Sequence, residues 1–272
     1  MNRFGEFTLI LPVYHGDKYE FFVECFESVL GNTLQPAEII VVFDGKVDVR
    51  IDDYLSNIQK NVERLIIKKL PQNVGLPAAL NIAIDESSFD VVCRMDADDV
   101  CDKDRFLIQW TEFSDKHYDL LGTGIIEFEK NPHEPSNVRQ YPTSSAQIRR
   151  YLSFRNAFAH PTVMFKKNKY YEAGGYCSND KYFEDWGLWL RMAKITRSVG
   201  NLEQPLVKMR ANIEQLQRRR GIRYLYYEWN FFMRYYRSNH LKMSSFLYLL
   251  FIRTPIRIIP ITFLKFIYKN RR

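Results

Sequence analysis

The chain has 272 residues, of which 46% are hydrophobic and 26% are charged, a composition typical of a folded globular protein with a large core. Its four cysteines form neither a CxxC pair nor a zinc-binding spacing. This argues against a disulfide-rich or zinc-stabilised protein and predicts reduced thiols in a cytosolic protein. No apolar run reaches the roughly 18 residues of a membrane-spanning helix, so we expect no such helix.

The net charge of +7 is distributed unevenly along the chain. The residues from Leu206 onward hold 15 Lys and Arg against 2 Asp and Glu, whereas the first 205 residues hold 24 against 30. An acidic body followed by a basic tail argues against nucleic acid binding over the whole surface. It predicts a tail that meets an anionic partner.

The first half of the chain alternates short apolar runs with amphipathic segments. Asp17 is expected to cap the first helix. The pattern predicts strands at 8–14, 38–43, 65–67 and 91–93, and helices at 17–30, 48–60 and 78–83. Strands that alternate with helices in this way indicate an α/β fold with a mostly parallel, doubly wound sheet.

The second half of the chain is less regular. We expect a helix that starts at Asp102 or Asp104, and another that starts at Thr143 or Ser144. A long loop is expected over 131–142, where proline and polar residues are frequent. The remaining predicted elements are strands at 120–128 and 160–165, a short helix at 166–173 and a helix that follows Glu184-Asp185.

After Arg210 the sequence becomes basic and aromatic. A helix is predicted over 222–236, and two further segments, 242–252 and 255–268, mix Leu, Ile and Phe with spaced Arg and Lys. Such segments suit basic amphipathic helices that lie in an anionic membrane surface. The alternative is a helical subdomain that packs on the rest of the chain and exposes a basic face.

Three carboxylates, Asp96, Asp98 and Asp99, follow the predicted strand at 91–93. Such a cluster at the end of a buried strand is costly unless something neutralises it. Mg²⁺ and Mn²⁺ prefer oxygen ligands, and Mg²⁺ is usually held by one or two carboxylates together with substrate phosphates. Because open α/β sheets bind ligands at the carboxyl ends of their strands, the stretch predicts a metal–diphosphate site. A solvated acidic turn that caps the next helix is the alternative.

Five motifs follow one another along the chain: Leu11-Pro12-Val13-Tyr14, Ile40-Val41-Val42-Phe43-Asp44-Gly45, Asn73-Val74-Gly75, Arg94-Met95-Asp96-Ala97-Asp98-Asp99 and Glu184-Asp185. In this order they resemble the family 2 glycosyltransferases with the GT-A fold. The resemblance covers roughly residues 7 to 210. It implies a Rossmann-like catalytic domain over 1–210, with a nucleotide-sugar half at about 1–128 and an acceptor half at 129–210. A basic aromatic extension over 211–272 follows.

The resemblance also assigns a donor site. It implies that Asp98 binds a divalent metal, Mn²⁺ or Mg²⁺, and that Asp96 contacts the ribose or the metal shell, while Arg94 orients these carboxylates or pairs with them. The family's nucleotide contacts fall on six further residues: Pro12, Val13, Tyr14, Asp44, Asn73 and Gly75. The family usually has two acids after the second strand, whereas here Phe43 precedes Asp44, so one acid is missing. Ordinary turns are the alternative for the Asp-Gly and Asn-Val-Gly motifs.

On the acceptor side, the resemblance makes Asp185 the base that deprotonates the acceptor hydroxyl, and Glu184 a residue that orients the site. An acidic helix start is the alternative for this pair. Further expectations place the acceptor or its phosphates at Trp186, His160, Arg210, Arg218 and Arg219. For each of these a structural role is the alternative, as a core tryptophan, a paired histidine or a solvated basic helix start.

The narrower resemblance is to bacterial enzymes that assemble O-antigen, capsule or other surface polysaccharides. It implies an inverting transfer of one sugar from a nucleotide-diphosphate sugar, by resemblance a UDP-sugar, to a lipid-linked oligosaccharide at the inner face of the plasma membrane. The family's processive members carry a QxxRW motif, which Gln215-Leu216-Gln217-Arg218-Arg219 does not match. The alternatives are a sugar-phosphate nucleotidyltransferase and a non-catalytic membrane- or polymer-binding protein on a transferase scaffold.

Overall fold

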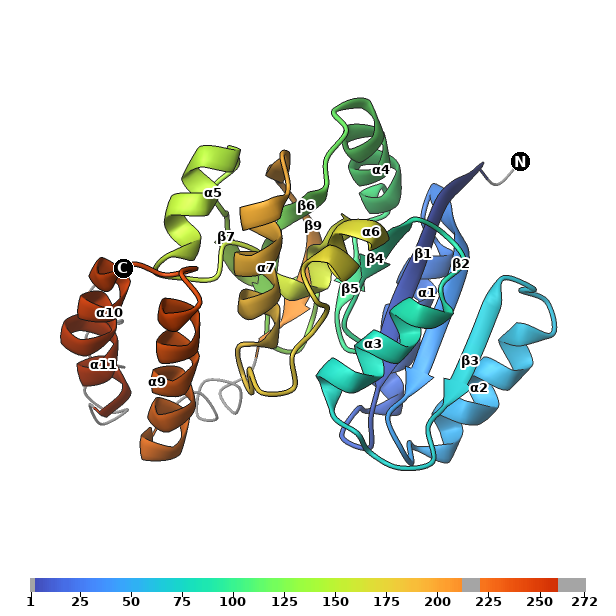
Figure 1. The fold of residues 1–272 in the computed structure, drawn as a ribbon. Helices are drawn as coiled ribbons and strands as arrows, with labels where there is room; N and C mark the ends of the chain where they lie inside the picture. The colour runs from blue at the N-terminus through green and yellow to red at the C-terminus, as the bar shows by residue number, and fades with distance from the viewer. Residues whose placement is uncertain (1–2, 212–220, 259–272) are drawn as a thin grey trace. The chain divides into compact units, whose positions relative to one another are not determined.

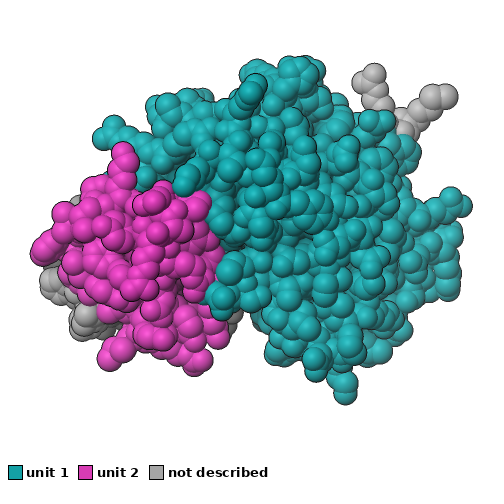
Figure 2. Space-filling model, in the orientation of Figure 1, with its two compact units in different colours: residues 1–179, 184–211 teal, residues 180–183, 212–272 magenta. Residues whose placement is uncertain are grey.

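The computed structural model describes residues 3–211 and 221–258. The chain divides into two compact units, which Figure 2 shows in different colours. The first unit comprises Met1–Asn179 and Glu184–Ala211, and the second comprises Asp180–Phe183 and Asn212–Arg272. A four-residue segment from the middle of the sequence therefore belongs with the C-terminal unit.

The first unit is built on one mixed β-sheet. Its parallel half runs in the order β3-β2-β1-β4 (Figure 1) and consists of β1 (Arg3–Val13), β2 (Leu34–Phe43), β3 (Leu65–Lys69) and β4 (Val91–Arg94). In the centre of the sheet, Leu9 of β1 is aligned with Ile39 of β2 and with Cys93 of β4. Because these four strands are parallel, their carboxyl ends meet at one edge of the sheet.

The other half of the sheet contains the antiparallel pairs. Its strands are β5 (Val100–Cys101), β6 (Leu120–Phe128), β7 (Pro135–Arg139), β8 (Met164–Lys166) and β9 (Val199–Arg210). β8 runs antiparallel to both β4 and β6, whereas β9 runs parallel to β6 and antiparallel to β5. The predicted α/β fold is confirmed, and its parallel strands are gathered mainly in the first half of the chain.

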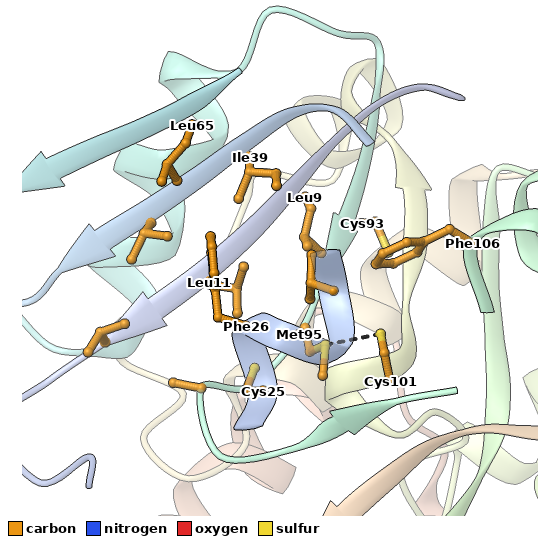
Figure 3. Packing of buried hydrophobic residues seen from close by; sticks show 14 of the residues in the cluster. Leu9, Leu11, Cys25, Phe26, Ile39, Leu65, Cys93, Met95, Cys101 and Phe106 are labelled. Atoms are coloured by element: carbon orange, nitrogen blue, oxygen red, sulfur yellow. Dashed lines mark hydrogen bonds between the residues drawn. The ribbon is translucent and has the colours of Figure 1, made fainter. Parts of the chain in front are cut away.

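Helices cover both faces of the parallel half of the sheet. These helices are α1 (Tyr19–Leu30), α2 (Val49–Gln59), α3 (Leu76–Glu86) and α4 (Arg105–Asp115). Alternate strand residues point to opposite faces. Leu9 and Leu11 therefore share one core with Phe26 of α1 (Figure 3), while the buried Ile10 lies on the other face, where α3 packs against β1 and β2.

The start of the first helix differs from the prediction. The helix begins at Tyr19 with Lys18 at its N-cap, so Asp17 is not the cap. Instead, the Asp17 carboxylate accepts a hydrogen bond from the Tyr14 backbone N–H at 2.8 Å. This bond closes the turn that directly follows β1.

Two predictions in the second half are also corrected. The strand expected over 160–165 begins only at Met164, because a 3₁₀ turn (His160–Thr162) precedes it and Pro161 has no N–H for a strand ladder. The loop expected over 131–142 contains β7, which pairs with β6. The remaining helices of this half are α5 (Ser145–Leu152), α6 (Lys167–Glu172) and α7 (Glu184–Ile195).

The described part of the second unit is helical. α9 (Gly221–Arg237) is followed by α10 (Met243–Tyr248), a π-helical turn (Leu249–Arg253) and α11 (Thr254–Ile258). The two separate segments expected over 242–252 and 255–268 thus form one continuous run up to residue 258, and the remainder lies outside the described residues. Within 3–211 and 221–258, no helix combines the length and apolar content needed to cross a bilayer.

Buried ion pairs hold the second unit together. Glu228 of α9 is fully buried and pairs with Arg253 and with Arg257. The buried Asp180 accepts hydrogen bonds from Arg234 at 2.5 Å and from the Tyr235 hydroxyl at 2.6 Å. Since an unpaired buried charge is costly, these contacts fix α11 and the segment Asp180–Phe183 against α9.

Candidate active site

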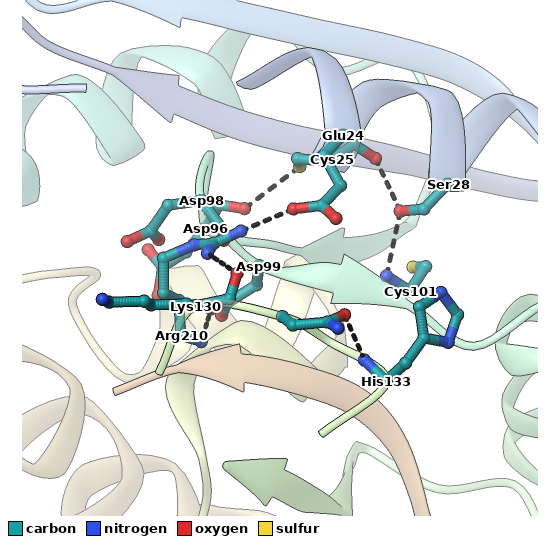
Figure 4. A network of polar contacts seen from close by, with 11 residues as sticks. Glu24, Cys25, Ser28, Asp96, Asp98, Asp99, Cys101, Lys130, His133 and Arg210 are labelled. Carbon is teal, nitrogen blue, oxygen red and sulfur yellow. Dashed lines mark hydrogen bonds and ion pairs between the residues drawn. The ribbon is translucent and has the colours of Figure 1, made fainter. Parts of the chain in front are cut away.

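The acidic stretch, residues 96–99, follows the end of β4. Arg94, the last residue of β4, has a buried side chain whose guanidinium donates to both carboxylate oxygens of Asp96, Nη1 to Oδ2 at 2.8 Å and Nη2 to Oδ1. From α1, the Cys25 thiol reaches the Asp96 carbonyl oxygen at 3.3 Å (Figure 4). The two-pronged ion pair fixes the orientation of the Asp96 carboxylate, which is the pairing role considered for Arg94.

The carboxylates of Asp98 and Asp99 are less well neutralised by neighbouring groups than the carboxylate of Asp96. Burial, and then the charge of Asp96, raise the pKa of Asp98 to about 6. Asp99 is 1% exposed, and its Oδ1 accepts a hydrogen bond from the Arg210 backbone N–H at 2.8 Å. Its Oδ2 is buried and finds no hydrogen-bond partner among the described residues. Burial, followed by the charges of Asp96 and Asp98, therefore raises the pKa of Asp99 well above its usual 3.8.

Arg210, at the end of β9, fastens the acidic stretch to its surroundings. Its guanidinium donates to the Asp98 carbonyl at 3.1 Å, to the Lys130 carbonyl at 3.1 Å and to the Glu24 carboxylate at 2.5 Å (Figure 4). The same group stacks on the Phe21 ring at 3.7 Å. Because this side chain is only 3% exposed, the geometry favours a positioning role over the phosphate contact expected from the sequence.

A third arginine lies beneath the acidic stretch. Arg105 of α4 is fully buried, and its Nη2 donates to the Arg94 carbonyl at 2.9 Å and contacts the Cys93 sulfur at 3.3 Å. Burial disfavours its charge, but Cys93, Cys101 and, less strongly, Asp99 favour it, so its pKa lies above the usual value. The backbone that enters the acidic stretch is therefore fixed from below by a buried cation.

Asp17 is a site residue that the sequence did not reveal as one. Burial raises its pKa to about 7, and the nearby charges of Asp98 and Asp96 contribute, although the bond from the Tyr14 N–H opposes the shift. The turn after β1 thus brings a further carboxylate near the acidic stretch. Its sequence position before a helix predicts only a cap, so no local signal pointed to this placement.

The acidic stretch fits a divalent cation bound together with phosphates. No group of three or more His, Cys, Asp or Glu side chains in the described residues encloses a metal position. Mg²⁺, however, usually keeps only one or two carboxylates and takes its other ligands from substrate phosphates and water. The raised pKa of Asp98 and the unpartnered Oδ2 of Asp99 mark oxygen atoms that a cation would stabilise.

The motifs that follow β2 and β3 form one hydrogen-bonded unit. Asp44 is 4% exposed, and its carboxylate accepts hydrogen bonds from the Val74 N–H at 2.6 Å, the Gly75 N–H at 3.0 Å and the Asn73 side chain at 3.0 Å. Gly45 has a φ of +83°, and a Cβ there would lie 2.7 Å from the Asn73 backbone nitrogen. Three of the predicted nucleotide contacts, Asp44, Asn73 and Gly75, are therefore brought together.

The end of β1 lies beside this unit. The Asp44 N–H donates to the Val13 carbonyl at 2.8 Å, and the side chains of Pro12 and Val13 are buried. Tyr14, by contrast, is 39% exposed. Of these three predicted nucleotide contacts, Tyr14 is the one whose ring is accessible, whereas Pro12 and Val13 can offer chiefly backbone.

The Glu184-Asp185 pair starts α7. Oδ2 of Asp185 accepts a hydrogen bond from the Asn156 side chain at 2.5 Å, and Oδ1 accepts one from the Trp186 N–H at 2.7 Å. Trp186 is 2% exposed, and its indole N–H donates to the Leu152 carbonyl at 2.8 Å. These contacts favour the packing role for Trp186, which ties α7 to the end of α5.

The half-buried His160 and the buried Tyr176 form a pair of polar side chains. The His160 Nε2 is 2.8 Å from the Tyr176 hydroxyl. Burial and then Arg94 hold the pKa of His160 well below its usual value. Burial raises the pKa of Tyr176, which Arg94 lowers and Asp185 and Glu184 raise. The charges that act on Tyr176 therefore come from Arg94, which precedes the acidic stretch, and from the Glu184-Asp185 pair.

The acidic stretch at the carboxyl end of β4 is typical of α/β proteins that bind a ligand at this edge of the sheet, and comparison with known proteins establishes the family. The profile for glycosyl transferase family 2 matches residues 8–182, and the chain belongs to this family. It is 32% identical to the UDP-Gal:alpha-D-GlcNAc-diphosphoundecaprenol beta-1,3-galactosyltransferase of Escherichia coli, over 97% of this chain and 96% of that protein. It is 33% identical to the amylovoran biosynthesis glycosyltransferase AmsE of Erwinia amylovora, over 98% and 99%.

Solved structures support the GT-A fold. Residues 1–349 of S. aureus TarS in complex with UDP-GlcNAc match with a TM-score of 0.63 at 16% identity, over 76% of this chain and 59% of that chain. The mannosyltransferase PcManGT from Pyrobaculum calidifontis, in complex with GDP-Man and Mn²⁺, matches with a TM-score of 0.57 at 14% identity, over 77% and 58%. The chain thus spans about three fifths of the length of these structures.

Two of the predicted acceptor residues, Arg218 and Arg219, lie outside the described residues.

Proposed function

We propose that this glycosyltransferase moves one sugar, with inversion, from a UDP-sugar to a lipid-linked saccharide during assembly of a bacterial surface polysaccharide. The observation that carries the proposal is that the protein's own donors orient carboxylates of both acidic motifs, since Arg94 holds Asp96 and Asn156 holds Asp185. A diphosphate leaving group needs charge stabilisation and an acceptor hydroxyl needs a base, and the site offers groups for both.

On the donor side, the unit formed by Asp44, Asn73 and Gly75 would bind the nucleoside, with the Tyr14 ring exposed next to it. Asp98 and Asp96 would hold a divalent cation, Mn²⁺ or Mg²⁺. When bound, such a cation stabilises the negative charge that builds on the departing diphosphate. Arg94 keeps Asp96 in place throughout, because both of its terminal nitrogens bind that carboxylate.

On the acceptor side, Asp185 removes the proton from the acceptor hydroxyl. The acceptor oxygen forms a bond to the anomeric carbon as the bond from that carbon to the diphosphate oxygen breaks. Attack from the opposite face inverts the configuration of the sugar. General-base catalysis of this kind contributes roughly 10²- to 10⁴-fold to the rate, and Glu184 would orient the site.

The acceptor class and the place of action rest on the relatives. One relative is named for action on a GlcNAc-diphosphoundecaprenol and the other for amylovoran biosynthesis. An acceptor on a lipid diphosphate would hold the enzyme at the inner face of the plasma membrane. We assign catalysis to residues 1–210 and membrane attachment to the basic extension over 211–272.

The test is transfer by the full chain from UDP-sugars to a synthetic lipid-diphosphate saccharide, with Mn²⁺ or Mg²⁺. The wild type is expected to transfer one sugar, and Asp185→Asn is expected to lose at least 10²-fold in kcat while still binding UDP. UDP binding is followed as a metal-dependent rise in melting temperature. Transfer only from GDP- or dTDP-sugars would contradict the donor assignment, and full activity in Asp185→Asn would contradict the base.

A further inference from the structure

Asn156 reaches the Asp185 carboxylate from a segment far away in the sequence. It lies in the segment between α5 and the 3₁₀ turn, 29 positions before its partner, and its Nδ2 donates to Asp185 Oδ2 at 2.5 Å. We propose that Asn156 is a positioning residue that holds the Asp185 carboxylate in the orientation needed to deprotonate the acceptor. This inference rests on the proposed function, in which Asp185 is the base.

The orientation of the Asn156 amide is fixed by a second hydrogen bond. Its Oδ1 accepts a bond from the Phe158 N–H at 3.2 Å. A backbone N–H can only donate, so the amide oxygen must face Phe158 and the amide nitrogen must face the carboxylate. Since Phe158 is 2% exposed, this anchor belongs to the packed interior.

The second carboxylate oxygen is held from another direction. Asp185 Oδ1 accepts a hydrogen bond from the Trp186 N–H in the first turn of α7, and the Trp186 indole is bonded to the Leu152 carbonyl. The carboxylate is therefore fixed at both oxygens by donors on two elements. Each carboxylate oxygen can accept more than one hydrogen bond, so a bond from a protein donor is compatible with one from the acceptor hydroxyl.

A misplaced base is costly in this chemistry. Displacement of a reacting group by about 1 Å can reduce a rate by roughly 10²-fold. Without the Asn156 donor, Oδ2 of Asp185 loses a hydrogen bond that orients the carboxylate toward the acceptor. Donor binding uses other residues, so the loss is expected in kcat and not in the donor KM.

Asn156→Asp separates positioning from a merely structural role. The aspartate keeps the shape of the side chain and an oxygen for the Phe158 N–H, but it replaces a donor with a carboxylate that repels Asp185. The matched control is Asn137→Asp. Asn137 also donates its amide to a carboxylate, Glu127 at 2.9 Å, but on the exposed strand β7.

The experiment measures kcat, donor KM and melting temperature for the full-length variants with the lipid-diphosphate acceptor. We expect kcat to fall by roughly 10- to 100-fold in Asn156→Ala and at least as much in Asn156→Asp, with donor KM and UDP binding changed less than about threefold. Asn137→Asp should retain wild-type kcat. Asn156→Ser, whose hydroxyl can still donate, should recover part of the activity.

Two outcomes would overturn the inference. Near-wild-type kcat in Asn156→Asp would show that only the shape of the side chain matters. A parallel loss of UDP binding or of melting temperature in every Asn156 variant would assign the residue to folding. If the wild type transfers no sugar from any donor, the proposed function fails. Normal activity in the Asn156 variants is a different result, because it contradicts only the positioning role.

Discussion

At the scale of single residues, the site is ordered by side chains that bind the protein's own backbone. Asp44 accepts two N–H groups of the following motif, Arg210 donates to two carbonyls, and Asn156 accepts the N–H of Phe158. Fixed donors and carboxylates lower the cost of organising the site when a substrate binds.

Asp44→Asn tests whether this carboxylate organises the nucleotide loop. An amide has one acceptor oxygen, and its NH₂ group would face the Val74 or Gly75 N–H. Buried donors left unpaired cost about 1–3 kcal/mol, so we expect a lower free energy of unfolding together with weaker UDP binding. Chemical denaturation and UDP titration measure the two effects. Asp53→Asn, an exposed site on α2, is the control, and an unchanged UDP affinity in Asp44→Asn would contradict the assignment.

The family resemblance pointed to residues in the loops that follow β2 and β3. Asp44, Asn73 and Gly75 were each expected beside the nucleotide, and the Asp44 carboxylate accepts hydrogen bonds from Asn73 and from Gly75. Asn156 and Asp17 were not anticipated as site residues. Their roles depend on partners that the fold supplies, and no spacing in the sequence marks such pairs.

At the scale of elements, Asp119 joins three strands of the mixed half of the sheet. It lies immediately before β6, and its carboxylate is bonded to Lys166 at the end of β8 at 3.0 Å. It also accepts the N–H groups of Arg197 and Ser198, at 3.0 and 3.4 Å, just before β9. One buried carboxylate therefore aligns β6 with β8 and β9.

This carboxylate should make the stability of the protein sensitive to acid. Burial alone would raise the pKa of Asp119, but the hydrogen bonds from Lys166, Arg197 and Ser198 outweigh it and lower the pKa below 3.8. The stabilisation is therefore present above about pH 4 and is lost as the pH falls through the folded-state pKa. Asp119→Asn should be less stable than the wild type near pH 7, and the difference should shrink below pH 4.

Urea unfolding at pH 7, 5, 4 and 3 measures this difference. Asp115→Asn, at an exposed position at the end of α4, provides the matched removal of a carboxylate. A gap between wild type and Asp119→Asn that is equally large at every pH would show that the charge of Asp119 has no stabilising role.

Some helices and strands can be predicted from the local sequence pattern, whereas others depend on pairing with strands that are distant in the sequence. The alternation of apolar runs and amphipathic segments predicted β1 to β4 and their helices, because each unit is local in sequence. β7 and β8 have five and three residues, and such short strands form only where a neighbouring strand offers an edge. Pro161 is a local feature that disfavours a strand at residue 160 and indicates a later start.

At the scale of the whole molecule, the second unit exposes many large apolar side chains. Seven large apolar side chains between 222 and 252 are more than a third exposed, and they are Ile222, Tyr226, Trp229, Met243, Leu247, Phe251 and Ile252. Together with the basic charge of the tail, such a surface suits an anionic bilayer. This is the physical basis for the proposed membrane attachment.

Phe251→Ser combined with Ile252→Ser should reduce binding to vesicles that contain phosphatidylglycerol. These side chains are 72% and 49% exposed, so their loss should leave the fold intact. Burying each in a membrane would contribute about 1.5–3 kcal/mol, so we expect at least a tenfold loss of partitioning in a vesicle sedimentation assay. Val49→Ser, which is 67% exposed on α2, is the control. Equal binding of the double variant and the wild type would contradict the membrane role.

The sequence was most informative about the order of motifs and least informative about the tail. The family and the GT-A fold were expected from five short motifs. The composition of the tail allowed both a membrane surface and a packed subdomain. The described helices show buried ion pairs and exposed apolar residues in the same unit, because packing geometry, which composition does not encode, selects the face that each residue occupies.

The three arginines around the acidic stretch have a consequence for how the donor arrives. Arg94, Arg105 and Arg210 lie around Asp96, Asp98 and Asp99, but Arg210 is also paired with Glu24, and Asp17 lies nearby. The acids therefore outnumber the arginines before anything binds, and a nucleotide diphosphate without its divalent cation would meet a site of its own sign. Dissolved salt screens such repulsion. Donor binding without the cation should therefore strengthen as ionic strength rises, whereas attachment of the basic tail to an anionic bilayer should weaken.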